Sequence, residues 1–486
     1  MRLGKWAARQ TKRIALLLVL GLFAFLGVRV YNIESGPPLK PWHTFVPEEL
    51  DREAIDRADW RTYVAAEEQL FAQVRDQVVR KLPPDERIPI NRYFEGSKVY
   101  PPNLPRDWNR TYSLSPQGEV RGAAVFLHGL TDSPYSLRHI ARRYTDHGFI
   151  SLAIRLPGHG TVPSGLGNVE WEDWLAATRL AVREARVAAG PGRPIHLIGF
   201  SNGGALALKY ALDAMDDKDL ARPERIVLIS PMVGITEFAR FVGLAALPAL
   251  LPTFSKAAWL SIVPEFNPFK YNSFPVNGAR QSRRLTLAIQ SDLASLASSG
   301  QAATFPPVLT FQSVLDFTVS SRAVVTALHA RLAQDRSELV LFDINRNTKL
   351  DLLLRPASEV AVDRLLPPSP RPFRTTVIAN RGGSSEQVEE RVTEAGSSEE
   401  LIHPLDIRVP SSIYSLSHVA LPFPMNDGLY GMLPADTPEE DFGVKLGSVA
   451  IRGERGALVV SLDALLRMSA NPFFPYLLQR IEEGIR

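Results

Sequence analysis

The sequence contains no cysteine among its 486 residues. This absence excludes disulfides, Cys-ligated zinc, iron–sulfur clusters, a cysteine nucleophile and a lipidated N-terminal cysteine. Hydrophobic residues make up 45% of the chain and charged residues 22%, a composition that suits a globular protein with a large core and argues against a largely disordered chain. Any chemistry must therefore use side chains other than cysteine.

The chain also has little net charge, with a formal value of +3 at pH 7. Five of its 55 basic residues lie within residues 1–13, which contain no acid, so 50 basic residues face 52 acidic ones in the remainder. Nucleic-acid binding requires a basic surface on the folded domain itself. We therefore expect no nucleic-acid partner.

An apolar run follows this basic segment, from Ile14 to Val28 and on to Tyr31. Its length is at the short end for a membrane-spanning helix, and it ends without the small residues that a signal peptidase requires. We predict that residues 14–31 form an uncleaved signal anchor, with a cleaved signal peptide as the main alternative and a core helix as the third. The charge asymmetry places residues 1–13 in the cytoplasm and the body outside it, on the periplasmic side if the source is bacterial.

Residues 32–118 are predicted to be a linker and an N-terminal extension. The proline-rich segment 36–47 is typical of an extended spacer. Apolar residues at helical spacing over 51–81 predict an amphipathic helix packed on the main domain. Segment 83–118, rich in Pro, Asn and Arg, is expected to wrap the domain as loops and edge strands.

From about residue 119 to 486, short apolar runs alternate with helical stretches. This alternation predicts an α/β fold with a doubly wound, mostly parallel sheet. The predicted strands are AAVFLHG (123–129), FISLAIRLPG (149–158), PIHLIGFS (194–201), RIVLISP (225–231), PVLTFQSVLD (307–316) and ELVLFDI (338–344).

Two segments interrupt this alternation. Residues 237–305 contain an apolar stretch punctuated by proline and are predicted to form a helical lid over the strand ends. The rival interpretation is a second transmembrane helix, but Pro248, Pro252 and Lys256 leave no clean apolar span. Residues 345–412 are predicted to be an insertion whose polar part, 381–400, forms a loop.

The motif GFSNGG (199–204) lies between a predicted strand and a predicted helix. A G-x-S-x-G sequence in that context is typical of a tight turn that presents a nucleophilic serine, and its glycines allow the close backbone approach. We therefore predict Ser201 as the nucleophile. Asn202, at the helix entry, would donate its backbone N–H to an oxyanion, and the loop after the first strand would add the N–H of Leu130.

A serine needs a base, and His418 is the candidate among nine histidines because it lies in SLSHVALPFP, a loop near the C-terminal end. The acid is expected at a strand end between nucleophile and base. Asp316 fits, Asp343 is the main competitor, and Asp427 is weaker because it follows the histidine.

The chain resembles the α/β-hydrolases, in particular the monoglyceride lipase, lysophospholipase and carboxylesterase branch grouped with serine aminopeptidase-like hydrolases. The matching motifs are LHGLTDSPYSLRHIA, LPGHG, VEWEDWLAA, GFSNGG, PVLTFQSVLDFTV and SHVALPF, which span about 120–425. The resemblance implies the α/β-hydrolase fold and the roles predicted above. The 102 positions from Asp316 to His418 exceed the usual family spacing.

These observations predict a membrane-anchored serine hydrolase that needs no cofactor or metal. Its expected substrates are carboxylic esters, with monoacylglycerols or lysophospholipids favoured by the apolar lid and the anchor. A peptidase or thioesterase would use the same residues, and a non-catalytic anchored scaffold of the same fold is the alternative from another class. A metal hydrolase is disfavoured because no histidines show a ligand spacing such as H-E-x-x-H.

Overall fold

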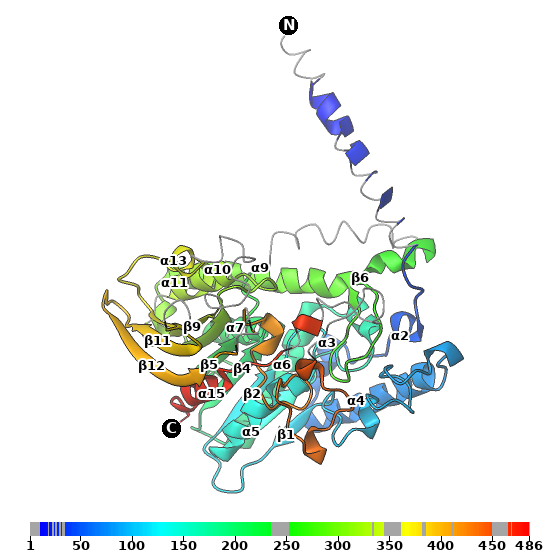
Figure 1. Ribbon diagram of the computed structural model, residues 1–486, viewed down its shortest axis with the longest axis horizontal. Coiled ribbons are helices and arrows are strands. Elements are labelled where there is room, and N and C mark those ends of the chain that lie inside the picture. Colours follow the sequence, from blue (N-terminus) through cyan, green and yellow to red (C-terminus); the bar gives the residue numbers. More distant parts are fainter. Residues whose placement is uncertain are drawn as a thin grey trace.

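The computed structural model describes most of the chain after residue 34 and isolated stretches before it (Figure 1). The described residues are 10–17, 19–21, 24, 27–28, 31, 35–234, 252–332, 335–344, 361–381, 385–410, 413, 415–449, 465–467 and 469–485.

Ten strands of this described part form one sheet in the order β1-β3-β2-β4-β5-β8-β9-β10-β11-β12. Neighbours from β3 to β10 pair in parallel, whereas β1, β11 and β12 are antiparallel to their neighbours. The strands are β1 Tyr112–Leu114, β2 Gly122–Leu127, β3 Phe149–Ile154, β4 Ile195–Phe200, β5 Arg225–Ile229, β8 Val308–Ser313, β9 Glu338–Asp343, β10 Arg374–Asn380, β11 Gln387–Thr393 and β12 Glu400–Arg408. All six predicted strands are confirmed.

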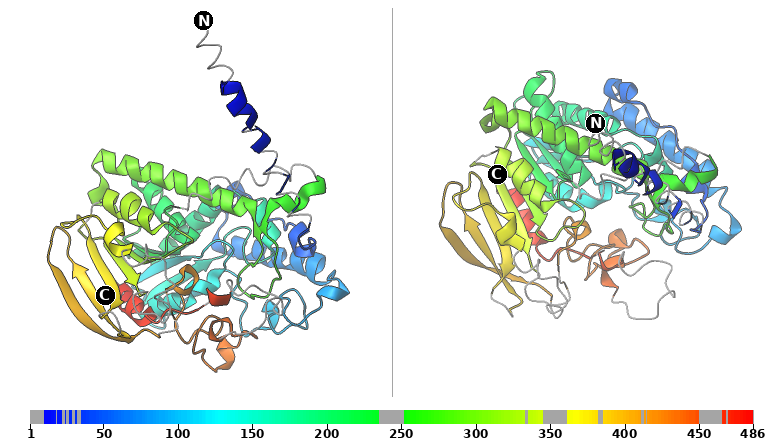
Figure 2. Two further views of the ribbon diagram at one scale, coloured as in Figure 1. Left: turned by 45° about the horizontal axis from the view of Figure 1, so that its top comes forward. Right: turned by 90° about the horizontal axis from the view of Figure 1, so that it is seen from above.

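Helices cover both faces of the sheet (Figures 1 and 2). In β2, Val125 and Leu127 join the core beneath α6, α7 and α9, while Ala124 and Phe126 join the core beneath α5 and α15. Alternate strand residues point to opposite faces, so a strand buried on both sides is apolar throughout. The longer helices are α4 Trp60–Val74, α5 Arg138–Asp146, α6 Trp171–Ala189, α7 Asn202–Asp216, α9 Val276–Ser299 and α15 Phe474–Glu482, and the shorter ones are α2 Pro41–Thr44, α3 Arg52–Arg57, α10 Ser321–Ala323, α11 Ala330–Leu332 and α13 Ala361–Leu365.

The N-terminal extension packs on the main domain much as its pattern predicts. The helical region comprises α3, α4 and a π-helical turn at Arg75–Val79, and its apolar side chains Leu70, Val74 and Val78 are buried. Strand β1 pairs with β3 at the edge of the sheet. The amphipathic helix and the edge strand are therefore confirmed.

The prediction of an extended spacer over residues 36–47 is wrong. This segment folds onto the body and contains the short helix α2, in which Trp42 is only 2% exposed and stacks on Tyr93 with ring centroids 5.2 Å apart. Proline favours extended backbone, but burial of this large indole decides the position of the segment.

The prediction of a loop over residues 381–400 is also wrong. Strand β11 occupies Gln387–Thr393, pairs with β10 and β12, and buries Val388 and Val392. Its sequence is dominated by charged and polar residues, so local composition gave little strand signal. The two neighbouring strands supply the pairing that stabilises it.

The predicted lid is smaller than expected. Helix α9 takes residues 276–299 into the helical layer, with Leu285, Ile289 and Leu293 buried in the core against that face of the sheet. Residues 252–275 remain as the described part that can cap the strand ends, with a 3₁₀ segment at Pro252–Ala258 and the paired strands β6 Trp259–Ser261 and β7 Phe274–Pro275. Residues 237–251 of the prediction lie outside the described residues.

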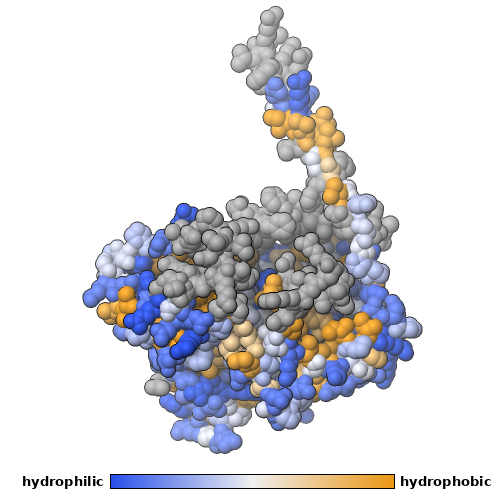
Figure 3. Space-filling view, viewed as in Figure 1, coloured by the Kyte–Doolittle hydropathy of each residue, from blue (hydrophilic) through white to orange (hydrophobic). Residues whose placement is uncertain are grey.

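The predicted anchor is described only in part. Its described positions between residues 10 and 31 are helical, and this segment projects from the body with a hydrophobic surface (Figure 3). Leu17 and Leu20 are among its exposed apolar side chains. Among the described residues, no helix has the length and hydropathy needed to cross a bilayer.

Candidate active site

Ser201 lies on a strained turn between β4 and α7. Its backbone has φ 54° and ψ −113°, a conformation that L-residues rarely adopt. A Cβ on Gly199 would lie 2.4 Å from the carbonyl oxygen of Gly203, and a Cβ on Gly203 would lie 1.9 Å from that of Leu127. Both positions therefore require glycine, as the G-x-S-x-G motif predicts, and the turn has the geometry expected of a nucleophile elbow.

The two predicted oxyanion donors flank this serine. Asn202 is the first residue of α7 and is fully buried, and the first N–H groups of a helix have no acceptor within the helix. Gly129, directly before Leu130, approaches the serine so closely that a Cβ added there would lie 3.4 Å from the Cβ of Ser201. The structure therefore places the Leu130 loop against Ser201.

His128 fixes that loop. The N–H of Leu156 donates to His128 Nε2 at 3.1 Å, so Nδ1 carries the proton and donates to the carbonyl of Gly129 at 2.9 Å. Burial holds the pKa of His128 well below its ordinary value, so the ring is neutral. His128 is thus a structural residue that ties the Gly129 loop to the LPGHG loop, residues 156–160.

Asp316 and His418 are 102 positions apart in the chain but form a hydrogen-bonded pair. His418 Nδ1 lies 2.8 Å from Asp316 Oδ2. The imidazole also packs against Phe200, which directly precedes Ser201, with ring centroids 5.2 Å apart. With Nδ1 bonded to the carboxylate, Nε2 is the nitrogen available to act as a base.

The carboxylate of Asp316 accepts three hydrogen bonds besides the one from His418. Its Oδ1 accepts from the N–H groups of Thr318 at 2.7 Å and Val319 at 3.0 Å, and its Oδ2 accepts from the side-chain amide of Gln312 at 3.1 Å as well as from His418. Burial raises the pKa of Asp316, but the nearby His418 and these donors outweigh it, so the pKa is lowered. Gln312 was not predicted from the sequence, and only its position in the β8 motif could have indicated it.

The competing acids lie elsewhere. Asp343 ends the neighbouring strand β9 and is buried, but the carboxylate that contacts His418 is that of Asp316. Asp427 accepts hydrogen bonds from Tyr135, Arg138 and His139.

One acidic and histidine cluster has the size of a metal site. It comprises His139, Asp427 and Glu440, which all lie in the described part of the chain. The guanidinium of Arg138 already lies between the two carboxylates, 2.7 Å from Asp427 and 2.5 Å from Glu440. A cationic side chain therefore balances these acids, and the cluster links α5 to the C-terminal segment.

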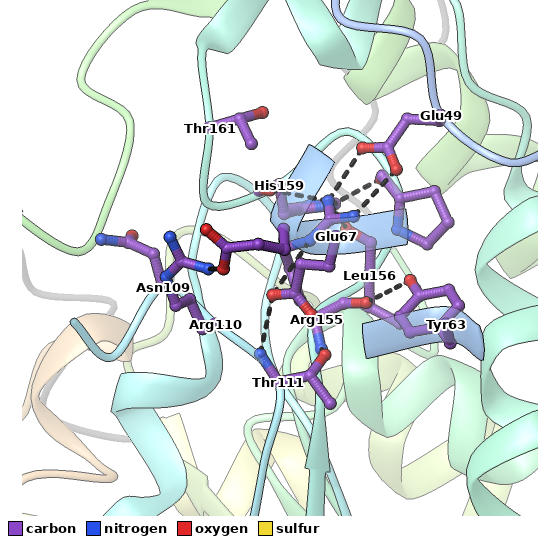
Figure 4. A network of polar contacts seen from close by, with 12 residues as sticks. Glu49, Tyr63, Glu67, Asn109, Arg110, Thr111, Arg155, Leu156, His159 and Thr161 are labelled. Carbon is purple, nitrogen blue, oxygen red and sulfur yellow. Dashed lines mark hydrogen bonds and ion pairs between the residues drawn. The ribbon is translucent and has the colours of Figure 1, made fainter. Parts of the chain in front are cut away.

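A buried arginine connects the N-terminal extension to the loops around the site (Figure 4). Both Nη atoms of Arg155 lie 2.8 Å from the carboxylate of Glu49, and the N–H of Gly158 donates to the same carboxylate at 2.7 Å. The guanidinium also donates to the carbonyls of Leu156 and His159. Glu49 thus fixes the LPGHG loop, which in turn contacts His128.

The family described as serine aminopeptidase, S33, matches residues 118–343, slightly less than half of the chain. A thermostable monoacylglycerol lipase from Bacillus sp. (strain H-257) is 30% identical over 87 residues, which are 18% of this chain and 34% of that relative. The chain thus matches about a third of the relative's length.

Two solved lipases are more distant. A monoglyceride lipase from Saccharomyces cerevisiae has 15% identity and a TM-score of 0.38, covering 48% of this chain and 81% of its own. A monoacylglycerol lipase from Paleococcus ferrophilus has 16% identity and a TM-score of 0.36, and the match covers 53% of this chain and 98% of that lipase. The family match and the order of the sheet support an α/β-hydrolase. The family match and the similarity to the Bacillus monoacylglycerol lipase favour the lipase and esterase branch.

Proposed function

We propose that the protein is a serine hydrolase that cleaves carboxylic esters through an acyl-enzyme intermediate. The observation that carries the proposal is the bonded pair of Asp316 and His418 packed beside the elbow that bears Ser201. A glycine-rich turn alone would not need a buried carboxylate and imidazole aligned at its side. The same features disfavour the scaffold alternative.

The geometry supports the following sequence of steps. Ser201 Oγ attacks the ester carbonyl while Nε2 of His418 takes the hydroxyl proton, and Asp316 stabilises the imidazolium. The backbone N–H groups of Leu130 and Asn202 bind the oxyanion. The intermediate collapses, the leaving alcohol takes the proton from His418, and water repeats the cycle on the acyl-enzyme.

Lipid-like acyl esters are the proposed substrates. This choice is favoured by the partial match to a monoacylglycerol lipase and by the exposed apolar residues of the predicted anchor. We propose in addition that the anchor holds the catalytic body at a membrane, on the side away from the cytoplasm. A peptidase or thioesterase would use the same atoms, because fold alone does not choose the substrate.

Labelling with a fluorophosphonate probe tests the mechanism. The full-length protein should react with the probe, and Ser201→Ala should abolish labelling and lower kcat for p-nitrophenyl acetate on the order of 10⁴-fold or more, because the nucleophile is lost. Ser298→Ala, at an exposed serine on α9, is the matched control and should label normally. Labelling that survives in Ser201→Ala, or none in the unaltered protein, would reject the proposal.

A further inference from the structure

The segment that follows the predicted anchor is fixed to one side of the body. The ring of His43 lies 3.0 Å from Ser273 Oγ and packs edge-on against Trp259. Lys256 Nζ donates to the carbonyl of Gly36 at 3.2 Å. Residues 35–46 therefore do not act as a free tether, and the base of the projecting helix is held against the described cap segment, 252–275.

Helix α9 begins at this same side of the body and runs along it (Figures 1 and 2). Residues 276–291 contain Arg280, Arg283 and Arg284 and no acidic residue. Arg280, Arg284 and Leu287 are exposed and lie three or four positions apart, so they form one stripe on the helix. Glu170 and Glu172 form ion pairs with Arg284. Among the described residues, no acidic side chain forms an ion pair with Arg280 or Arg283, so their positive charges remain available.

A groove opens on this face of the body. It lies between the fixed segment and the start of α9, and its lining includes Val46, Trp259, Val276 and Arg280. Within the same first turns of α9, a Cβ on Gly278 would lie 3.8 Å from the side chain of Leu130. The first turns of α9 thus border the groove with one side and contact the side chain of Leu130 with the other.

We propose that this face, formed by residues 252–261 and the first half of α9, docks on an anionic lipid surface and turns the groove toward the bilayer. The occupant is a membrane because an apolar helix leaves the protein at this face and the adjoining helix is basic and carries an exposed leucine. Each arginine close to an anionic surface strengthens association by about fivefold. The proposal rests on the proposed function for the substrate, a lipid-like ester that would reach the site from this surface.

The absence of cysteine permits a direct test. Leu287→Cys creates a single labelling site for an environment-sensitive dye on the full-length protein, and Val187→Cys, at a 73% exposed position near the end of α6, is the matched control. The protein is mixed with vesicles of phosphatidylcholine alone or with 30% phosphatidylglycerol. We expect a blue-shifted spectrum for the label at position 287 only in the anionic vesicles, and no shift at position 187.

The charge requirement is tested in the same assay. Arg280→Gln combined with Arg283→Gln should weaken the response at position 287 by about fivefold to 25-fold, and salt should do the same. The control pair is Arg121→Gln with Lys218→Gln, two exposed basic positions outside this face, and should leave the response unchanged. A label that stays solvent-like in anionic vesicles, or shifts equally in both kinds, would overturn the proposal.

Activity separates this proposal from the proposed function. The double arginine variant should hydrolyse p-nitrophenyl acetate normally but lose about fivefold or more in the rate on a long-chain fluorogenic ester embedded in anionic vesicles. Equal rates on the embedded ester would overturn the docking proposal while leaving the hydrolase intact. If the unaltered protein hydrolyses neither substrate, the proposed function is rejected, whatever the dye reports.

Discussion

Two regions outside the family-matched segment extend the sheet in different ways. The N-terminal extension, residues 35–114, reaches the loops beside the candidate site through the buried Arg155. The C-terminal addition, β10 to β12 over residues 374–408, continues the sheet from the far strand β9 through backbone pairing. The first is coupled to the loops beside the site by side chains, and the second is joined to the sheet by backbone pairing.

This difference has a physical consequence. A buried charge must be paired, so removing its partner is costly and disturbs every loop that the charge holds. Backbone pairing at a sheet edge spreads its energy over many bonds, and the last strand β12 has most of its residues exposed. We therefore expect damage to the first region to change catalysis and damage to the second to change only stability.

The largest expected effect is that of Glu49→Ala. This change leaves the guanidinium of Arg155, which is 2% exposed, without its bidentate partner and frees the N–H of Gly158. We expect a loss of about 3–5 kcal/mol in the free energy of unfolding. We also expect kcat to fall with little change in KM, because the LPGHG loop would no longer fix His128 and, through it, the Leu130 loop that is predicted to bind the oxyanion.

Arg52→Ala is the matched control, since Arg52 is 41% exposed and pairs with acids at the surface. Its effect on the free energy of unfolding should stay below about 1 kcal/mol. A folded Glu49→Ala protein with unchanged kcat would break the comparison, because the extension would then act on stability alone.

Val388→Ala should have an intermediate effect. Val388 on β11 is fully buried, and removing its two methyl groups should cost about 2 kcal/mol in urea unfolding. The kcat for a soluble ester, measured on the folded fraction, should not change. A lower kcat would show that the far edge of the sheet is coupled to the site after all.

The smallest effect is a pH dependence that arises at Glu67. Burial raises the pKa of this carboxyl above its ordinary value of 4.5, and Arg155 offsets the burial only in part. The native state therefore binds the proton more tightly, and stability is lost as the pH rises from 4.5 through the folded pKa. Glu67→Gln keeps an acceptor for the N–H of Thr111 and should remove this loss.

The measurement is urea unfolding of both proteins between pH 4.5 and 8. As the pH rises, the free energy of unfolding of Glu67→Gln should increase relative to that of the unaltered protein. The expected increase is about 1.4 kcal/mol for each pH unit by which folding raises the pKa of Glu67. A difference that is constant across this range, or that reverses, would show that the Arg155 charge fully compensates the burial of Glu67.

Local pattern sufficed for much of the fold and for the identity of the candidate site residues. The six strands that carry or flank the site are short apolar runs, and the local motif marks Gly199 and Gly203, although the contact that requires Gly203 is with Leu127 on a neighbouring strand. The pairing of Asp316 with His418 was proposed from motifs, although an insertion separates them. Glu49 was missed because its partners lie more than 100 positions away, and Gln312 was missed because no local pattern marks a residue that supports another.

The sequence by itself determined the alternation of strands and helices typical of an α/β sheet, the glycine-flanked turn at Ser201 and the apolar N-terminal run, because each depends on neighbouring residues or on a period of two or 3.6. Only the tertiary structure decided that the proline-rich segment 36–47 packs on the body and that the polar segment 387–393 is a strand. It also decided that Glu49 reaches Arg155. These features depend on what surrounds a residue in space, since burial of a side chain or pairing with a distant strand outweighs local preference.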